Sequence, residues 1–197
     1  MLKGTEVVAY TMMRARRVEP RPSTGLDLEP VGFETDLKGG VIPQEYIPSV
    51  ERGVRDAAAG GVVTGYPLID IVVTLIDGKF HDTDSSEIAF EAAGSIALQQ
   101  AVEKAGVRLL EPIMRLQVVV PNEYFGDVTG DLMSRRAEIV DTELRGMARV
   151  ITAMVPLAAM FGYATTVRSL TQGRATYSME PSHYAPVPDE IAKTLLD

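Results

Sequence analysis

Apolar and polar positions divide the first half of the chain into helical and extended segments. Residues 69–76 alternate in a way that predicts a β-strand with one strongly apolar face. Before this strand, residues 48–59 carry valine and alanine at helical spacing, Pro48 suits a first helical turn, and Gly60-Gly61 ends the pattern. The pattern predicts a helix, then a strand and, further along, a second helix.

The second helix is expected over residues 84–105. Asp84 and Glu87 have the spacing of a capping box at its start, and Gly106 suits the C-cap. Apolar and small residues follow a roughly helical stripe that permits close packing against a sheet: Ile88, Ala92, Ile96, Ala97, Val102 and Ala105.

The segment between the strand and the second helix is polar and carries His81. Asp77-Gly78 is a turn signal at the end of the strand, and nothing between it and the helix cap requires burial. We therefore expect His81 to lie exposed on a loop. Residues 14–40 are the least regular part of the chain, with several Arg among Pro and Gly, which indicates loops with room for one short strand.

The second half of the chain, after Pro112, repeats strand and helix patterns in a different order. Arg145-Gly146 is a hairpin turn between two of its four expected strands. The order β-α-β-β-α-β is the ferredoxin-like arrangement, so the expected fold class is α+β, with domains at residues 1–110 and 111–197. Strands are expected at residues 114–120, 139–144, 148–154 and 175–179, and helices at residues 126–137 and at 157–163 or slightly beyond.

Composition then limits the chemistry. The 197 residues include no Cys and two His, which excludes disulfide scaffolds and Cys nucleophiles and argues against a His-rich metal site. The formal net charge of −8 argues against nucleic-acid binding through a broadly basic surface. No apolar run approaches the roughly 18 residues that cross a bilayer, and the amino terminus does not resemble a signal peptide, so we expect a cytoplasmic protein.

Several local motifs suggest chemistry, and each has a simpler explanation. The acidic cluster at residues 77–87 lacks the spacing of an EF-hand, so a capped helix explains it and no metal site is expected. The Gly-Lys pair at 78–79 lacks the first Gly and the Ser or Thr of a P-loop, and Asp-x-x-Gly at 127–130 indicates only a turn into a helix. Basic clusters at 135–136 and 168–174 fit solvated helix ends. The residues alone indicate a soluble two-domain α+β protein.

Several long strings resemble bacterial elongation factor G, in the same order along the chain. GGVIPQEYIP at residues 39–48, GYP at 65–67 and DGKFHDTDSSE at 77–87 are similar to its fourth domain. GDVTGDLMSRR at 126–136 and MFGYAT at 160–165, followed by TQGR, are similar to its fifth domain. The resemblance extends from about residue 39 to residue 188.

This resemblance implies a ribosomal-protein-S5-domain-2-like domain followed by a ferredoxin-like domain, the carboxy-terminal pair of a translocation GTPase. It implies a monomer that supports tRNA–mRNA translocation through contacts with ribosomal RNA, with tRNA and mRNA at the decoding region, and with ribosomal proteins near the GTPase-associated centre. GTP and Mg²⁺ belong to the GTP-binding domain of the full-length family, which has no counterpart in this sequence. We therefore expect no enzymatic activity and no cofactor in this chain.

The resemblance also places candidate RNA contacts in both domains, without implying a catalytic residue or a metal ligand. The candidates are Lys79, His81 and Asp82 in the tip loop of the first domain, and Arg168, Gln172 and Arg174 in the second domain.

One departure from the family concerns the glycine-rich segment of the tip. It should follow residues 5–10, but Arg-containing residues 14–20 stand there, so we expect a tip loop and part of a strand to be missing. The chain is then either a piece of a divergent paralogue or the product of a truncated gene. Two alternative functions remain open: a stand-alone ferredoxin-like regulatory module that binds a small molecule or a protein, and a degenerate paralogue without translocation activity.

Overall fold

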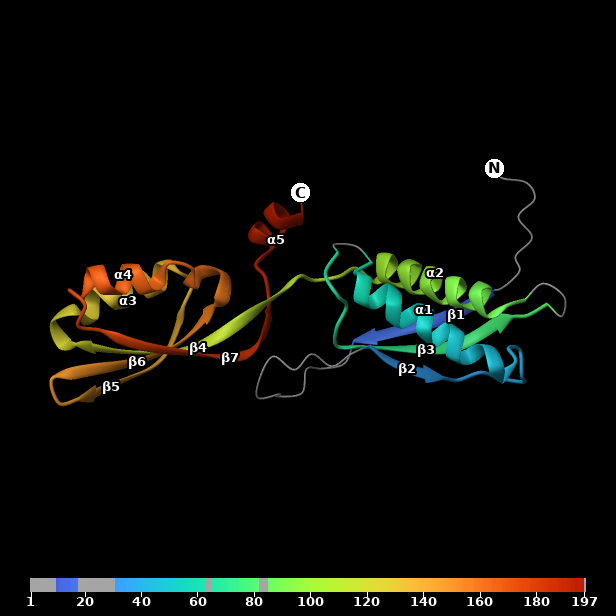
Figure 1. Cartoon of the computed structure of the whole chain (residues 1–197), viewed down its shortest axis with the longest axis horizontal. Coiled ribbons are helices and arrows are strands. Elements are labelled where there is room, and N and C mark those ends of the chain that lie inside the picture. The colour runs from blue at the N-terminus through green and yellow to red at the C-terminus, as the bar shows by residue number, and fades with distance from the viewer. Residues whose placement is uncertain (1–9, 18–30, 63–64, 82–84, 197) are drawn as a thin grey trace. The chain divides into compact units, whose positions relative to one another are not determined.

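The computed structural model shows two compact units, each with its own sheet and core (Figure 1). One unit comprises residues 10–17 and 31–107, and the other comprises the residues from 108 onward. The residues that the structure describes are 10–17, 31–62, 65–81 and 85–196.

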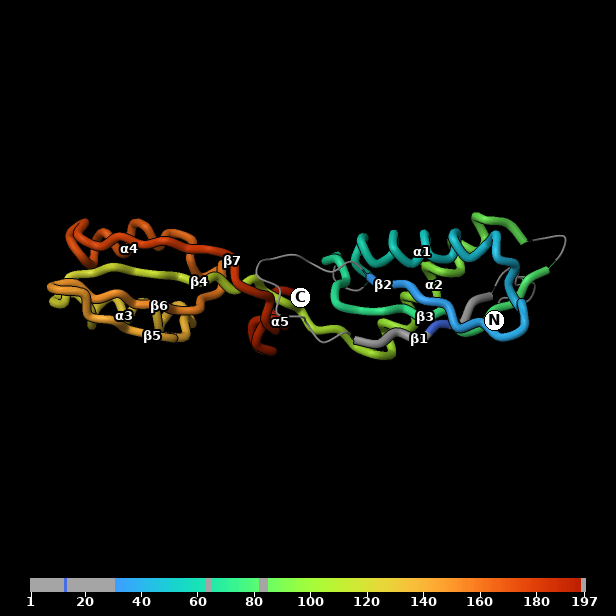
Figure 2. The backbone as a smooth tube through the Cα atoms, turned by 90° about the horizontal axis from the view of Figure 1, so that it is seen from below, coloured from blue at the N-terminus to red at the C-terminus, as the bar shows by residue number. Residues whose placement is uncertain are grey.

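The first unit is a three-stranded sheet with two helices on one face (Figures 1 and 2). In chain order its elements are β1 (Tyr10–Arg17), β2 (Gly32–Thr35), the 3₁₀ turn η1 (Gln44–Tyr46), α1 (Ile47–Gly60), β3 (Ile71–Lys79) and α2 (Glu87–Ala105). The central strand is β3, which pairs antiparallel with β1 and parallel with β2. Because β2 and β3 are parallel, α1 serves as the crossover between them.

The helices α1 and α2 meet through glycine residues. A Cβ atom at Gly53 would lie 1.9 Å from the carbonyl oxygen of Glu91, and one at Gly94 would lie 2.6 Å from the carbonyl oxygen of Val50. No side chain fits in so little space, so glycine at these two positions sets how closely the helices approach.

The buried face of α2 differs from the stripe that the sequence predicts. Its buried residues are Phe90, Gly94, Leu98 and Val102. From the predicted stripe, only Val102 is buried, and the residues that are exposed are Ile88, Ala92, Ile96 and Ala105. This helix is apolar on nearly every side, so periodicity does not single out one face. The glycine contact with α1 decides which face turns inward.

The start of α2 also differs from the prediction, whereas its end agrees with it. The N-cap is Ser86, whose Oγ accepts a hydrogen bond from the Ala89 N–H at 3.2 Å. The predicted cap, Asp84, lies outside the described residues. At the other end Gly106 caps the helix with a φ of +72°.

The turn predicted at Asp77-Gly78 is wrong, because β3 continues through these residues. Gly78 lies opposite Thr11, and the last strand residue, Lys79, lies opposite Tyr10. The partner strand β1 supplies the hydrogen bonds of the ladder and keeps the chain extended, which overrides the local preference of Asp-Gly for a turn.

The strand β1 occupies part of the segment where the sequence predicts mostly loops. Residues 14–17 pair with residues 71–74, so Arg17 lies opposite Ile71, at the end of β3 that is far from Lys79. The structure therefore shows residues 14–17 as a strand where the sequence predicts mostly loops, and the absence of the glycine-rich tip loop stays a prediction. Residues 18–20 lie outside the described residues.

The second unit is a four-stranded antiparallel sheet with helices on one face (Figure 1). Its elements are β4 (Leu110–Pro121), η2 (Asn122–Tyr124), α3 (Phe125–Ser134), β5 (Glu138–Arg145), β6 (Ala148–Pro156), η3 (Leu157–Met160), α4 (Tyr163–Leu170), β7 (Thr176–Pro186) and α5 (Asp189–Leu196). The sheet order β5-β6-β4-β7 is that of a ferredoxin-like fold, which confirms the expected fold.

Details of the second unit refine the predicted elements. The hairpin turn at Arg145-Gly146 is confirmed, with Gly146 at a φ of +65°. The helix expected over residues 157–163 is instead a 3₁₀ turn followed by α4, because Gly162 adopts a φ of +76° between them. The strand β7 is longer than expected, and α5 was not expected. No helix in the described part of the chain is long and apolar enough to cross a membrane.

Candidate functional site

The end of β3 carries two of the predicted site residues. Lys79 and His81 are exposed, and the residue between them, Phe80, is partly buried. Successive side chains of an extended chain point in opposite directions. Because Phe80 points toward the core, the side chains of Lys79 and His81 point toward solvent. The ring of Phe80 packs on that of Tyr46, with ring centroids 6.1 Å apart. Tyr46 in turn stacks on Phe90, with ring centroids 4.8 Å apart. This aromatic row fixes the end of the strand against α2.

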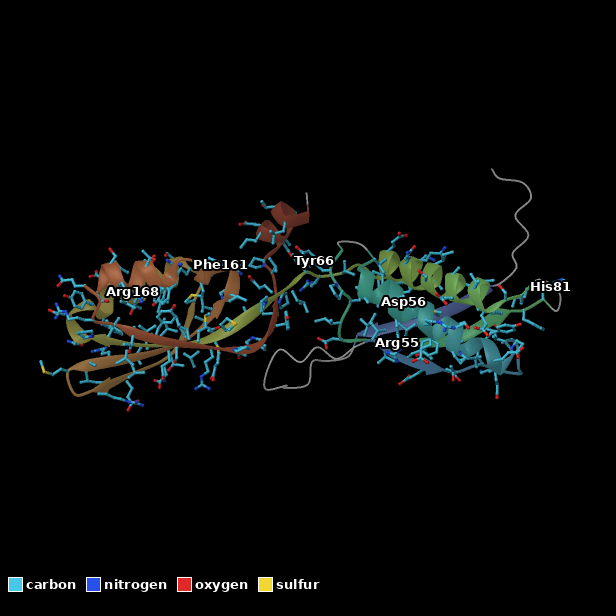
Figure 3. All side chains as sticks on the ribbon, in the orientation of Figure 1. Arg55, Asp56, Tyr66, His81, Phe161 and Arg168 are labelled. Carbon is cyan, nitrogen blue, oxygen red and sulfur yellow. The ribbon has the colours of Figure 1, made fainter. Side chains whose placement is uncertain are left out.

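The backbone of His81 is held as well. Its N–H donates to the Oγ of Ser85 at 3.0 Å, and its carbonyl oxygen accepts from the Ser85 N–H at 3.2 Å. Figure 3 shows the side chain at the extremity of the first unit. The third predicted tip residue, Asp82, lies outside the described residues. The structure therefore fixes the main chain at His81 and leaves the imidazole exposed.

A further cation, Lys38, lies at the same end of the first sheet. Because β2 runs parallel to β3, with Thr35 opposite Leu75, the loop that follows β2 begins at the end where β3 finishes. The Asp36 N–H donates to the Leu75 carbonyl at 2.8 Å, and the exposed Lys38 follows two residues later. Sequence reasoning missed this residue because it left room for one short strand within residues 14–40 without placing it. Unless β2 is placed, the loop that follows it cannot be assigned to either end of the sheet.

In the second unit, the loop after α4 has a fixed shape. Thr171 is buried, and its Oγ1 donates to the Val167 carbonyl at 2.6 Å and accepts from the Ala175 N–H at 3.2 Å. Gln172 and the following glycine adopt left-handed φ values of +52° and +75°. A non-glycine residue in this region costs energy unless its surroundings impose it, and here the hydrogen bonds of Thr171 do so.

The two arginines of this region have different environments. Arg174 forms an ion pair with Glu123 at 2.7 Å, lies 4.9 Å from the ring centre of Tyr124 and hydrogen-bonds to the Tyr124 hydroxyl. It also donates to the Gln172 side-chain oxygen at 3.3 Å. The exposed side chain of Arg168 makes no hydrogen bond or ion pair with any residue that the structure describes. Arg168 is therefore a free cation among the described residues, whereas Arg174 is held in place and orients Gln172.

The other basic cluster, Arg135-Arg136, is not a solvated helix end. Arg135 pairs with Asp131 at 2.8 Å, donates to the Ala159 carbonyl at 2.7 Å and lies 5.2 Å from the ring centre of Tyr163. Arg136 pairs with the buried carboxylate of Glu111. Both side chains hold elements of the second unit together, so the structure does not favour them as RNA contacts.

Tyr163 lies inside the same network. Burial raises the pKa of its hydroxyl well above the ordinary value, and the nearby Asp131 carboxylate raises this pKa further. The hydroxyl has no hydrogen-bond partner among the described residues. Its ring is 1% exposed and meets Tyr177 edge to face at 5.2 Å, so the group is structural.

The open face of the second sheet is acidic. In three rows of paired residues that run across its four strands, it carries no aromatic residue. The strand register brings to this face, opposite the core, the side chains Arg115, Gln117, Val119, Glu138, Asp141, Glu143, Val150, Thr152, Met154, Thr176, Ser178 and Glu180. Proteins that bind single-stranded RNA on a four-stranded sheet stack bases on aromatic side chains there. RNA contact by this face is therefore not favoured, and the loop after α4 remains the better candidate.

Two shallow grooves beside α1 have volumes of about 230 and 290 Å³, below the roughly 300–1,000 Å³ of small-molecule pockets. No group of three or more His, Asp or Glu among the described residues is arranged to hold a metal ion.

Comparison with known proteins identifies the two units. The family model described as "Elongation factor G, domain IV" matches residues 10–106, and the one described as "Elongation factor G C-terminus" matches residues 108–195. The chain belongs to the elongation factor G family. The resemblance seen in the sequence strings is thereby confirmed, and neither of the two matched regions is a GTP-binding domain of that family.

A solved structure provides a second comparison. The protein designated ttk003000868 from Thermus thermophilus is 33% identical to this chain, with a TM-score of 0.77. The match covers 98% of this chain and 31% of that chain, so the chain spans about a third of the length of this relative. The similarity to this solved structure therefore extends over nearly the whole sequence.

Proposed function

We propose that this chain is the ribosome-contacting carboxy-terminal region of an elongation factor G-like translation factor. In a complete factor it supports movement of tRNA and mRNA, while GTP hydrolysis takes place in another region. The observation that carries the proposal is the exposed pair Lys79 and His81 at the end of a domain IV unit. An ammonium and an imidazole at such a position donate hydrogen bonds to phosphate or to a ribose 2′-hydroxyl.

The second unit contributes a separate contact in this proposal. Arg168 is exposed and has no partner among the described residues, so it meets a phosphate without losing an existing ion pair. Gln172 lies on the same rigid loop, and Arg174 acts by holding the Gln172 side chain in place. Loops fixed before binding lose little conformational entropy when they dock.

The charge distribution supports binding through a few placed contacts. A chain with a net charge of −8 and an acidic open sheet gains little from general attraction to RNA. We therefore propose a monomeric, cytoplasmic protein whose partners are ribosomal RNA, tRNA and mRNA at the decoding region, and ribosomal proteins near the GTPase-associated centre. The small groove volumes weigh against the alternative of a small-molecule regulatory module.

Co-sedimentation with 70S ribosomes at low salt tests this proposal. We expect the chain to pellet with ribosomes, and Lys79→Ala combined with His81→Ala to weaken binding by roughly tenfold, since two hydrogen bonds of about 0.5–1.5 kcal/mol each are lost. The matched control is Lys104→Ala, because Lys104 is an exposed cation near the far end of α2, roughly 25 Å along the helix from Glu87. Failure to pellet, or an equal loss in the control, would contradict the proposal.

A further inference from the structure

An apolar ridge runs along the outer side of α2. Ile88 is 80% exposed and Ile96 is 53% exposed, with the exposed Ala92 between them at helical spacing. The opposite side of the same helix is already filled, since Phe90 and Leu98 are completely buried. A helix that is apolar on both sides has more apolar surface than its own unit covers.

Beside this ridge lies a groove between α1 and α2. Its floor is made by the close helix contact at Gly53, which leaves no side chain between the helices. With about 230 Å³ it accommodates protruding side chains of another macromolecule and is too small for a typical small-molecule ligand. The residues that line it are Gly53, Asp56, Ile88, Glu91, Ala92 and Ser95.

The rim of the groove is acidic once its ion pairs are taken into account. Arg52 lies 3.1 Å from Glu91, and Arg55 lies 2.6 Å from Glu51, so both guanidinium groups are engaged. Asp56, which is exposed, has no hydrogen bond or ion pair with any residue that the structure describes. Figure 3 shows Arg55 and Asp56 on α1. Acidic side chains therefore outnumber basic ones at the rim, and a polyanion such as RNA is disfavoured there.

We propose that this surface docks a basic amphipathic helix of a protein partner. The apolar side of that helix lies along Ile88, Ala92 and Ile96, and a Lys or Arg side chain of it reaches the unpaired carboxylate of Asp56. Helix-in-groove recognition uses this combination of apolar anchors for affinity and charge complementarity for specificity. None of these side chains is among the proposed ribosome contacts, so the inference does not depend on the proposed function.

A fluorescent peptide tests the proposal on the whole chain. The chain contains no Trp, so an amphipathic helical peptide of Leu and Lys with a single Trp reports binding by a blue shift of its emission. We expect this peptide to bind and a Leu and Glu peptide of the same pattern not to bind. Ile88→Gln with Ile96→Gln should weaken binding at least about tenfold, because much of the buried apolar area is lost. Asp56→Asn should weaken it about threefold and reduce its salt dependence.

Matched controls separate this surface from general attraction to an acidic protein. Val140→Gln with Leu144→Gln changes two exposed apolar residues of β5, and Asp127→Asn changes an exposed carboxylate of α3. Both should leave peptide affinity unchanged, and circular dichroism should show that every variant is folded. If the Ile variant loses its fold, Asp56→Lys decides the question, with an expected loss of about tenfold.

Four results would overturn the proposal. The first is equal affinity for both peptides, and the second is equal loss in the control variants. The third is poly(U) binding that is abolished by the Ile changes, which would make RNA the occupant. The fourth is a dimer in sedimentation velocity that the same changes dissociate, which would make a second copy of the chain the occupant.

Discussion

Gly53 of α1 lies directly against the backbone of Glu91 in α2, so close that a Cβ would stand 1.9 Å from the Glu91 carbonyl oxygen. This contact determines which side of α2 turns toward the sheet and which side remains outside. The aromatic row behind His81 depends on the same orientation, because Phe90 is buried on the inner side of α2. One glycine thus affects both the core and the position of the tip.

Gly53→Ala should lower the free energy of unfolding of the first unit by about 2 kcal/mol. The added methyl forces the helices apart, and this overpacking outweighs the gain of up to about 1 kcal/mol in helix propensity. Gly60→Ala in the same helix is the control, since a Cβ there meets nothing within 4 Å, and the stability of this variant should be unchanged or slightly higher. Urea unfolding followed by circular dichroism measures both. A Gly53→Ala protein as stable as the parent would show that the helix contact is less tight than described.

Tyr163 should make the second unit less stable at alkaline pH. Its hydroxyl has a raised pKa in the folded state and titrates near pH 10 when unfolded, so the folded form keeps its proton longer. The raised pKa of Tyr163 therefore contributes fully to the free energy of unfolding below about pH 10. This contribution is lost as the pH rises above that value, by up to about 1.4 kcal/mol per pH unit.

In urea unfolding, Tyr163→Phe should reduce the fall of the free energy of unfolding with pH above about pH 10. At pH 7 the stability of this variant should be unchanged or higher, because a hydroxyl without a hydrogen-bond partner among the described residues is removed. Tyr66→Phe, at a 54% exposed tyrosine, should keep the slope. Equal slopes in the parent and in Tyr163→Phe would assign the alkaline transition to other groups.

The isolated chain should neither bind nor hydrolyse GTP. The only Gly-Lys pair, Gly78-Lys79, lies inside β3 opposite Tyr10 and Thr11, so its backbone belongs to a strand ladder and not to a phosphate-binding loop. Isothermal titration calorimetry with GTP and Mg²⁺ should show no heat of binding. A dissociation constant in the low micromolar range would refute this.

Residues 108–197 should fold when expressed alone. The ferredoxin-like sheet and its core cluster are complete within residues 110–186, and proteins of this size commonly fold independently. Circular dichroism and a cooperative thermal transition should match the second transition of the whole chain. An unfolded product would place the domain boundary elsewhere or show that the second unit needs the first.

The second unit could be predicted well from the sequence because its signals are local. Residues 114–120 alternate regularly between buried and exposed positions. Gly146 marks the hairpin turn between β5 and β6, where its φ is +65°. The break at Gly162 could not be seen, because the apolar residues on both sides of it have helical spacing.

The first unit was predicted less well because long-range contacts decide its details. Asp77-Gly78 has the local signature of a turn and is a strand because β1 pairs with it. At the candidate site, the exposure of His81 followed from polar neighbours, whereas Lys38 required knowledge of β2. The difference between Arg168 and Arg174 depends on Glu123, which is 51 residues away from Arg174 in sequence.

The central claim is that the tip at His81 acts during translocation. Its most direct test grafts this chain in place of the corresponding region of an active elongation factor G and measures tRNA–mRNA translocation by rapid kinetics. The chimera should bind ribosomes and translocate slowly, and His81→Ala should slow translocation by a further threefold to tenfold, roughly the value of one hydrogen bond of about 0.5–1.5 kcal/mol. GTP hydrolysis should stay nearly constant. An unchanged translocation rate in the His81→Ala chimera would contradict the role assigned to the tip.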